Sequence, residues 1–134
     1  MPDRAPPRLL SAAQAVLATL DAARIPACLI GGMVISRWGQ PRATTDADIS
    51  ALAPYGEEAR VLDALLTRFE ARRVDARAFA LDHRVLLISE GGVGIDVALA
   101  AFPFEIEALE NATPWRLGEG ITLLSARQIS STFT

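Results

Sequence analysis

Hydrophobic residues three and four positions apart mark several segments of this chain, a spacing typical of helices with one buried face. Two segments also open on capping-box sequences, Ser11-Ala12-Ala13-Gln14 and Ser125-Ala126-Arg127-Gln128, whose serine and glutamine side chains can bond free backbone N–H groups. The spacing predicts helices over Ser11–Arg24, Met33–Trp38, Pro54–Arg72 and Phe104–Asn111, and the start of another at Ser125.

Other segments are short apolar runs, or alternate between apolar and polar residues, as strands do. Between two of them, Glu90-Gly91-Gly92 is typical of a tight hairpin turn. The strands are expected over Ala27–Ile30, Asp46–Leu52, Arg77–Leu81, Arg84–Ser89, Val93–Ala100, Trp115–Leu117 and Ile121–Leu124. This alternation of helices and strands predicts an α/β (α+β) domain with a mixed β-sheet flanked by helices.

Composition sets limits on the class of protein. With 134 residues, 51% of them hydrophobic, the chain can form a single domain with a buried core over residues 1–134. The proline-rich residues 1–8 are expected to be flexible. No apolar run reaches the roughly 18 to 20 residues of a membrane span, and the N-terminal segment lacks the apolar region of a secretory signal. We therefore expect a cytoplasmic protein, with Cys28 as a small buried hydrophobe.

Charge and residue usage exclude several chemistries. The net charge of −3 provides no overall field that attracts nucleic acid. All 13 basic residues are arginines, which excludes a catalytic lysine. A single cysteine and a single histidine cannot form a cysteine–histidine zinc site.

Three aspartates carry the candidate chemistry. Asp46 and Asp48 alternate on one expected strand, so both point to one face, roughly 6.5 to 7 Å apart. Asp96 lies within another apolar strand and is flanked on its own face by Gly94 and Ala98, which leave room for a ligand. If these strands are neighbours, three carboxylates converge. Such a cluster is stabilised by a divalent cation, and oxygen ligands suit Mg²⁺ or Mn²⁺.

A glycine pair completes the candidate site. Gly31-Gly32 lies between a strand and an expected helix, where backbone N–H groups can bind the phosphates of a nucleoside triphosphate. Arg37 and Arg42 are nearby candidates for binding phosphate, and Thr44 shares the strand face of the aspartates. Phosphoryl transfer depends mainly on such positioning and charge neutralisation.

Each feature also has an ordinary structural interpretation. A Gly-Gly pair is often only a turn, and an Asp-x-Asp sequence can be a solvated strand end. Asp96 could pair with an arginine such as Arg84 instead of a metal. Arg37 and Arg42 could be solvent-exposed residues of a helix and a loop.

Taken together, Gly31-Gly32, Asp46-Ala47-Asp48 and Asp96 resemble the signature of the nucleotidyltransferase superfamily with the polymerase-beta-like fold. The wider pattern, from Ile30 through Gly39 to Arg42-x-Thr44-x-Asp46-x-Asp48-Ile49, looks most like the abortive-infection type, which includes toxins of toxin–antitoxin systems.

The resemblance implies a minimal nucleotidyltransferase fold and transfer of a nucleoside monophosphate from an NTP to a hydroxyl of tRNA, protein or a small molecule. It implies that Asp46, Asp48 and Asp96 bind Mg²⁺ or Mn²⁺, and that Gly31 and Gly32 contact the triphosphate. An antitoxin or a second copy of the chain is an implied partner. The family usually continues into a further helical region, so a truncated C-terminus is expected here. That departure leaves a second hypothesis open: an inactive nucleotidyltransferase-like domain that binds nucleotide or protein.

Overall fold

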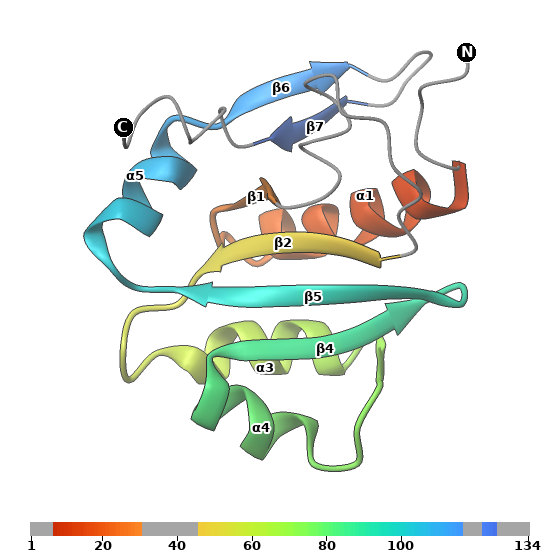
Figure 1. Cartoon of the computed structure of the whole chain (residues 1–134), viewed down its shortest axis with the longest axis vertical. Coiled ribbons are helices and arrows are strands. Elements are labelled where there is room, and N and C mark those ends of the chain that lie inside the picture. Colours follow the sequence, from red (N-terminus) through yellow and green to blue (C-terminus); the bar gives the residue numbers. More distant parts are fainter. Residues whose placement is uncertain (1–6, 31–45, 117–121, 126–134) are drawn as a thin grey trace.

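The structure is a computed structural model that describes residues 7–30, 46–116 and 122–125 (Figure 1). For Asp46 it describes the backbone and not the side chain. The helices are α1 (Pro7–Ala22), α3 (Glu58–Leu66), α4 (Ala76–His83) and α5 (Pro103–Glu110). The strands are β1 (Ala27–Ile30), β2 (Asp46–Leu52), β3 (Glu70–Ala71), β4 (Val85–Glu90), β5 (Val93–Ala100), β6 (Thr113–Arg116) and β7 (Thr122–Ser125).

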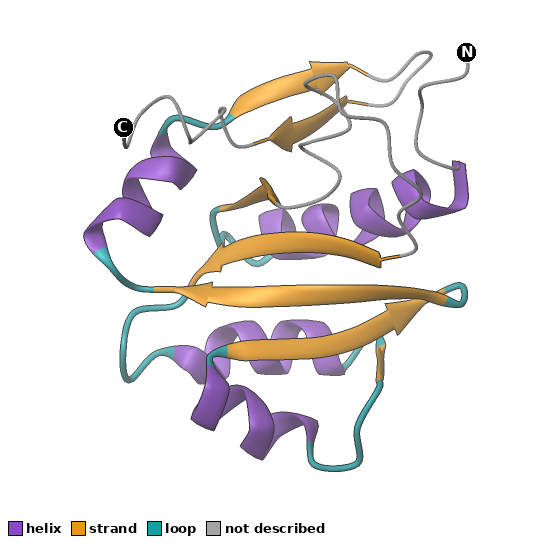
Figure 2. Cartoon of the chain, viewed as in Figure 1, coloured by secondary structure: helices purple, strands orange, loops and turns teal. Residues whose placement is uncertain are grey.

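The described strands form one mixed sheet in the order β3-β4-β5-β2-β1-β7-β6 (Figure 2). β2 runs parallel to β5, β1 runs parallel to β7, and the other neighbours are antiparallel. The predicted class, a mixed sheet flanked by helices, is confirmed. Because β2 and β5 are parallel neighbours, they bring together two segments that are about 45 residues apart in the chain.

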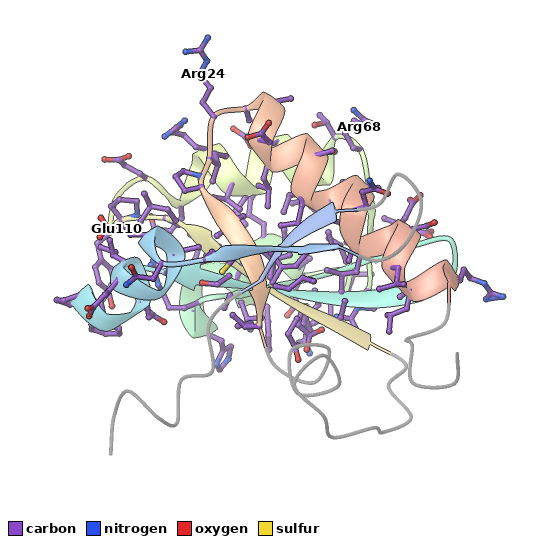
Figure 3. The ribbon with its side chains drawn as sticks, turned by 90° about the horizontal axis from the view of Figure 1, so that it is seen from above. Arg24, Arg68 and Glu110 are labelled. Atoms are coloured by element: carbon purple, nitrogen blue, oxygen red, sulfur yellow. The ribbon has the colours of Figure 1, made fainter. Side chains whose placement is uncertain are left out.

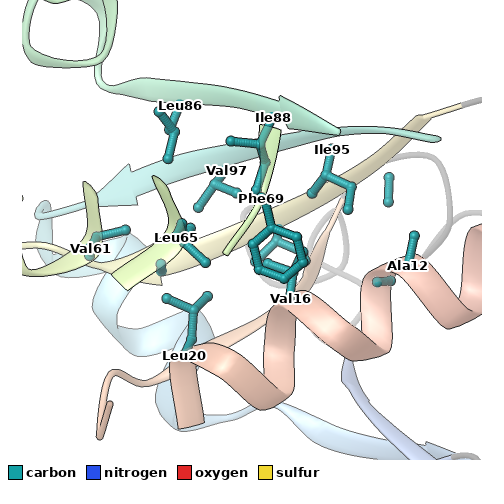
Figure 4. Close-up of a cluster of buried hydrophobic side chains, with 14 of the residues drawn as sticks. Ala12, Val16, Leu20, Val61, Leu65, Phe69, Leu86, Ile88, Ile95 and Val97 are labelled. Atoms are coloured by element: carbon teal, nitrogen blue, oxygen red, sulfur yellow. The ribbon is translucent and has the colours of Figure 1, made fainter. Parts of the chain in front are cut away.

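Helices α1 and α3 cover one face of the sheet, as the perpendicular view in Figure 3 shows. Alternate residues of the central strands point into this layer, among them Ile49 of β2 and Ile95 of β5, both fully buried. Figure 4 shows how the helices meet the sheet, with Val16 and Leu20 of α1 facing the strand residues. This continuous core fixes which face of β2 and of β5 is buried, so the polar residues of both strands are on the opposite face.

The second face is covered in part. Cys28 is fully buried although its neighbour Leu29 belongs to the core under the helices, so alternation places Cys28 on the second face. Its register partner Ser50 is also buried. Helix α5, which contacts β2, begins with Pro103 in its first turn, where a missing N–H costs nothing.

The hairpin between β4 and β5 follows the prediction from sequence. Glu90 pairs with Val93, and Gly91 and Gly92 form the turn with φ angles of 59° and 83°. Two successive residues with positive φ are typical of the turns that match strand twist, and glycine adopts this conformation without strain.

The strand predicted over Arg77–Leu81 is wrong, because this segment is helix α4. The alternating pattern of Ala76 to Leu81 fits a strand, but alanine is also the strongest helix former. Ala76 and Ala80, four residues apart, are both buried in the core. Helical spacing of these small residues therefore decides the structure.

The limits of two helices also differ from the prediction. Ser11 is not the N-cap of α1, because the helix begins at Pro7 and buries Leu9 and Leu10 in its first turns. The helix expected over Pro54–Arg72 is limited to α3, and the chain then forms the edge strand β3. Its last apolar residue, Phe69, still reaches the core.

Two expected helices lie outside the described residues: the one over Met33–Trp38, and the one starting at Ser125, which is itself the last residue of β7. Within the described segments, none of the helices is both long and apolar enough to span a membrane.

Candidate active site

A row of register partners crosses the sheet at the candidate site. Asp48 of β2 is the partner of Asp96 of the parallel strand β5. On one side Asp48 pairs with Ile30, the last residue of β1, and on the other side Asp96 pairs with Leu87 of β4. Neighbouring strands are separated by about 4.8 Å, so the two aspartates stand next to each other on adjacent strands.

The same register places Asp46. It begins β2, two residues before Asp48, and its partner on β5 is Gly94. Residues two apart on a strand point to the same face, so the backbone assigns both aspartates of β2 to the face that carries Asp96. Gly94 and Ala98 flank Asp96 there, as expected, and both are partly exposed.

The residues between the aspartates anchor the site. Ala47 and Ile49 of β2 and Ile95 and Val97 of β5 are fully buried in the core beneath the site. Asp48 and Asp96, in contrast, are partly exposed. A shift of either strand by one residue would bury a carboxylate and expose an apolar side chain, so the core sets the register that brings the two aspartates together.

Arg72 forms an ion pair with Asp96. Its Nη2 atom donates to Oδ1 of Asp96 and, at 3.2 Å, to the backbone carbonyl of Ile95. Arg72 directly follows β3, and its backbone N–H donates to the carbonyl of Leu87 at 3.0 Å. It therefore extends the row of register partners, two strands from Asp96, and its side chain reaches across β4.

The alternative that Asp96 pairs with an arginine such as Arg84 is confirmed for an arginine, Arg72, and is wrong for Arg84. Arg84 ends α4 in the left-handed conformation, with φ of 60°, and its guanidinium turns to the other end of β5. It donates to Oε2 of Glu58 at 2.6 Å and to the carbonyls of Ala53 at 2.6 Å and Leu99 at 3.0 Å. This guanidinium therefore ties the ends of β2 and β5 to the start of α3.

The carboxyl of Glu58 is held in its charged form. Its pKa is lowered from the ordinary value because backbone N–H groups, including that of Gly56 at 3.0 Å, donate to it and because Arg84 stands beside it. The pair is largely shielded, with side-chain exposures of 20% for Arg84 and 16% for Glu58. We assign it a structural role, because Arg84 joins the ends of the two strands that carry the aspartates to Glu58 of α3.

Several predicted site residues are not placed. Gly31, Gly32, Arg37, Arg42 and Thr44 lie outside the described residues. Within the described part of the chain, no group of three or more His, Cys, Asp or Glu residues is arranged to hold a metal ion. The side chain of Asp46 is not among the described ones, so the three-carboxylate metal site stays a prediction.

Arg72 was not among the residues predicted from sequence. It follows a two-residue strand, which has no hydrophobic pattern of its own, within a segment predicted to be helical. Only the pairing of β3 with β4 brings it into the row of Asp96. The one available signal was general: a partly buried carboxylate needs a positive partner, and this chain offers only arginines.

No protein-family model and no curated protein matches this chain. Among solved structures it is similar to an antigenic nucleotidyltransferase-like protein from Paracoccidioides brasiliensis, with 16% identity and a TM-score of 0.56. The alignment covers 92% of this chain and 62% of that one, so the chain spans less than two thirds of its neighbour. The likeness shows a nucleotidyltransferase-like fold. A second structure, ANT(2″)-Ia in complex with adenylyl-2″-tobramycin, has 17% identity over 84% of this chain and 65% of its own, with a TM-score of 0.49.

Proposed function

We propose that this chain is a metal-dependent nucleotidyltransferase that transfers a nucleoside monophosphate from an NTP to a hydroxyl acceptor. The observation that carries the proposal is the pairing of Asp48 with Asp96 on adjacent parallel strands. Asp46 precedes Asp48 by two residues on the same strand, and the motif Gly31-Gly32 follows β1, the other neighbour of β2. The nucleotidyltransferase-like fold supports the same assignment.

The residues fit a divalent cation by their chemistry. Like charges on neighbouring strands are destabilising, and Arg72 supplies one positive charge at Asp96. Carboxylate oxygens are the ligands that Mg²⁺ and Mn²⁺ prefer. In the proposal, Asp46, Asp48 and Asp96 hold the cation, which would neutralise charge on the triphosphate and help activate the acceptor hydroxyl.

The protein's own part in the reaction is to bind and orient. The carboxylates sit on strands whose opposite face is packed in the core, which gives a rigid platform of the kind that transfer by positioning requires. Backbone N–H groups of Gly31 and Gly32 are proposed to contact the triphosphate. Arg37, Arg42 and Thr44 are proposed to assist at the phosphates, with the arginines as charged donors.

The acceptor is the open part of the proposal. Candidates are a hydroxyl of tRNA, of a protein or of a small molecule. The motif from Ile30 to Ile49 supports a toxin of a toxin–antitoxin system, with an antitoxin or a second copy of the chain as partner. A cytoplasmic location belongs to the same proposal, and it agrees with a lone cysteine buried in the sheet.

The test is transfer of radiolabel from each of four α-labelled NTPs, with Mg²⁺ or Mn²⁺, to acceptors of the three classes. Asp46→Asn and Asp48→Asn should each lower transfer by about 100-fold or more, because each removes a charged ligand. Asp82→Asn, on the exposed side of α4, is the matched control with the same charge change. Undiminished transfer by Asp46→Asn would exclude the assignment.

The second candidate is an inactive nucleotidyltransferase-like domain that binds nucleotide or protein. The specific observation in its favour is that Arg72 pairs with Asp96, so an internal positive charge already engages a carboxylate that the metal would need. Calorimetric titration with Mg²⁺ and a non-hydrolysable NTP separates the two candidates. Binding that is lost in Asp48→Asn, with no product from any acceptor, supports a binding module.

A further inference from the structure

The structure defines a charged partner for Asp96. Arg72 and Asp96 form an ion pair in which the side chains are 30% and 38% exposed. The same Nη2 atom also donates to the carbonyl of Ile95, next to Asp96 in the chain. The guanidinium is therefore held at this point of the sheet by a backbone acceptor as well as by the carboxylate.

The backbone of Arg72 is fixed too. Its N–H donates to the carbonyl of Leu87, and the preceding residue Ala71 pairs with Ile88 of β4. These bonds anchor both ends of the side chain, so the positive charge cannot move far from Asp96 without breaking the contact with Ile95. A divalent cation bound by Asp96 would lie near a fixed like charge and would share the carboxylate with it.

We infer that Arg72 is a positioning residue that holds the Asp96 carboxylate and competes with a divalent cation for it. The inference rests on the proposed function, because it takes Asp96 to be a metal ligand. Arg72 lies outside the predicted motif. Its positive charge, in the same row as Asp96 and Asp48, would lower the affinity of the site for a divalent cation.

The test is binding of Mn²⁺ alone, followed by electron paramagnetic resonance at constant ionic strength, in wild type and four variants. Arg72→Gln removes the competing charge and should tighten Mn²⁺ binding by about three- to tenfold. Arg72→Lys keeps a donor and a positive charge and should stay within about twofold of wild type.

Arg73→Gln is the matched control, because it removes an equal charge from the adjacent residue, whose partner is Asp75 and not Asp96. Asp48→Asn reports whether Mn²⁺ binds at the proposed site, and it should weaken binding. Thermal unfolding of each variant without metal verifies that all are folded.

The outcomes are separable. Equal or weaker Mn²⁺ binding by Arg72→Gln, with Asp48→Asn weakened, overturns the inference and leaves the proposed metal site intact. Tightening by Arg73→Gln to the same extent also overturns it, because net charge and not the contact with Asp96 would then explain the effect. Binding that is absent, or that is indifferent to Asp48→Asn, overturns both the inference and the metal site of the proposed function.

Discussion

Asp48 and Asp96 are register partners on two parallel strands, although 47 residues separate them in the chain. Their strands carry fully buried residues on the opposite face, so the pairing follows from the core and needs no contact between the carboxylates. Two acidic groups side by side are normally avoided in a sheet. Here Arg72 stands beside one of them and supplies a positive charge at Asp96.

The first prediction concerns Gly94, the register partner of Asp46. Gly94 is partly exposed on the face of the aspartates and is not among the described glycines with positive φ. Valine can therefore adopt its backbone conformation, and strands favour valine over glycine by up to about 1 kcal/mol. We expect Gly94→Val to keep or raise the thermal midpoint and to lower nucleotidyl transfer about tenfold or more, because its side chain fills the space beside Asp46.

Ser89→Val is the control for this prediction. Ser89 is the other register partner of Gly94, on β4, one strand further from β2. The same branched side chain at Ser89 should leave transfer within about twofold of wild type. Equal transfer by Gly94→Val and wild type would show that the space beside Asp46 is not used.

The second prediction concerns acid stability. Because the pKa of Glu58 is lowered from its ordinary value of 4.5, its carboxylate stabilises the fold at pH values above 4.5. This stabilisation is lost as the pH falls below 4.5 and through the pKa of the folded state. Glu58→Gln should therefore unfold at a lower urea concentration than wild type at pH 7, and the difference should shrink below pH 4.

Arg84→Gln extends this prediction. It removes the hydrogen bonds to Glu58, Ala53 and Leu99, and it should lower the free energy of unfolding by about 2 kcal/mol at pH 7. Glu107→Gln changes an exposed glutamate of α5 and is the matched control for Glu58→Gln. It should unfold as wild type does, both at pH 7 and below pH 4. A gap between Glu58→Gln and wild type that widens in acid would contradict the assigned role of the carboxylate.

Much of the sheet could be predicted from sequence because its central strands are strongly patterned. The limits of β1, β2 and β5 agree with the predicted ranges. Buried apolar residues alternate with polar or small ones along β2 and β5, and β1 is a short apolar run. The faces of Asp48 and Asp96 followed from the same alternation. The sequence does not show that β2 and β5 are neighbours, because the pairing of distant strands leaves no local signal. The predicted site only required that they be neighbours.

Two predictions, the strand over Arg77–Leu81 and Arg84 as the partner of Asp96, are wrong for physical reasons. The spacing of Ala76 and Ala80 fits a strand as well as a helix, and only their packing in the core shows that the segment is helix α4. Arg84 adjoins a strand in the sequence, which favours it as the partner of Asp96, whereas the actual partner, Arg72, follows a two-residue strand without a pattern of its own. An ion pair across three strands depends on tertiary placement and cannot be derived from spacing.

The last prediction concerns Cys28, which is fully buried on the face of the aspartates as the register partner of Ser50. Burial raises the pKa of its thiol from 9.0 to about 11. The reactive thiolate is then only about one part in a thousand at pH 8, and the reagent has no access to it. We expect a disulfide reagent to label the native protein at least about 100-fold more slowly than the protein in urea.

The raised pKa also has a consequence for stability in alkali. A buried neutral thiol contributes stability below pH 9.0, and this contribution is lost as the pH rises toward 11. The alkaline loss of stability should therefore be smaller in Cys28→Ala than in wild type, measured by urea unfolding at pH 7 and pH 10. Cys28→Ala should also abolish labelling in urea, which identifies the reacting group. Fast labelling of the native protein would mean that this part of the sheet opens readily, and the rigid platform assigned to the aspartates would then be wrong.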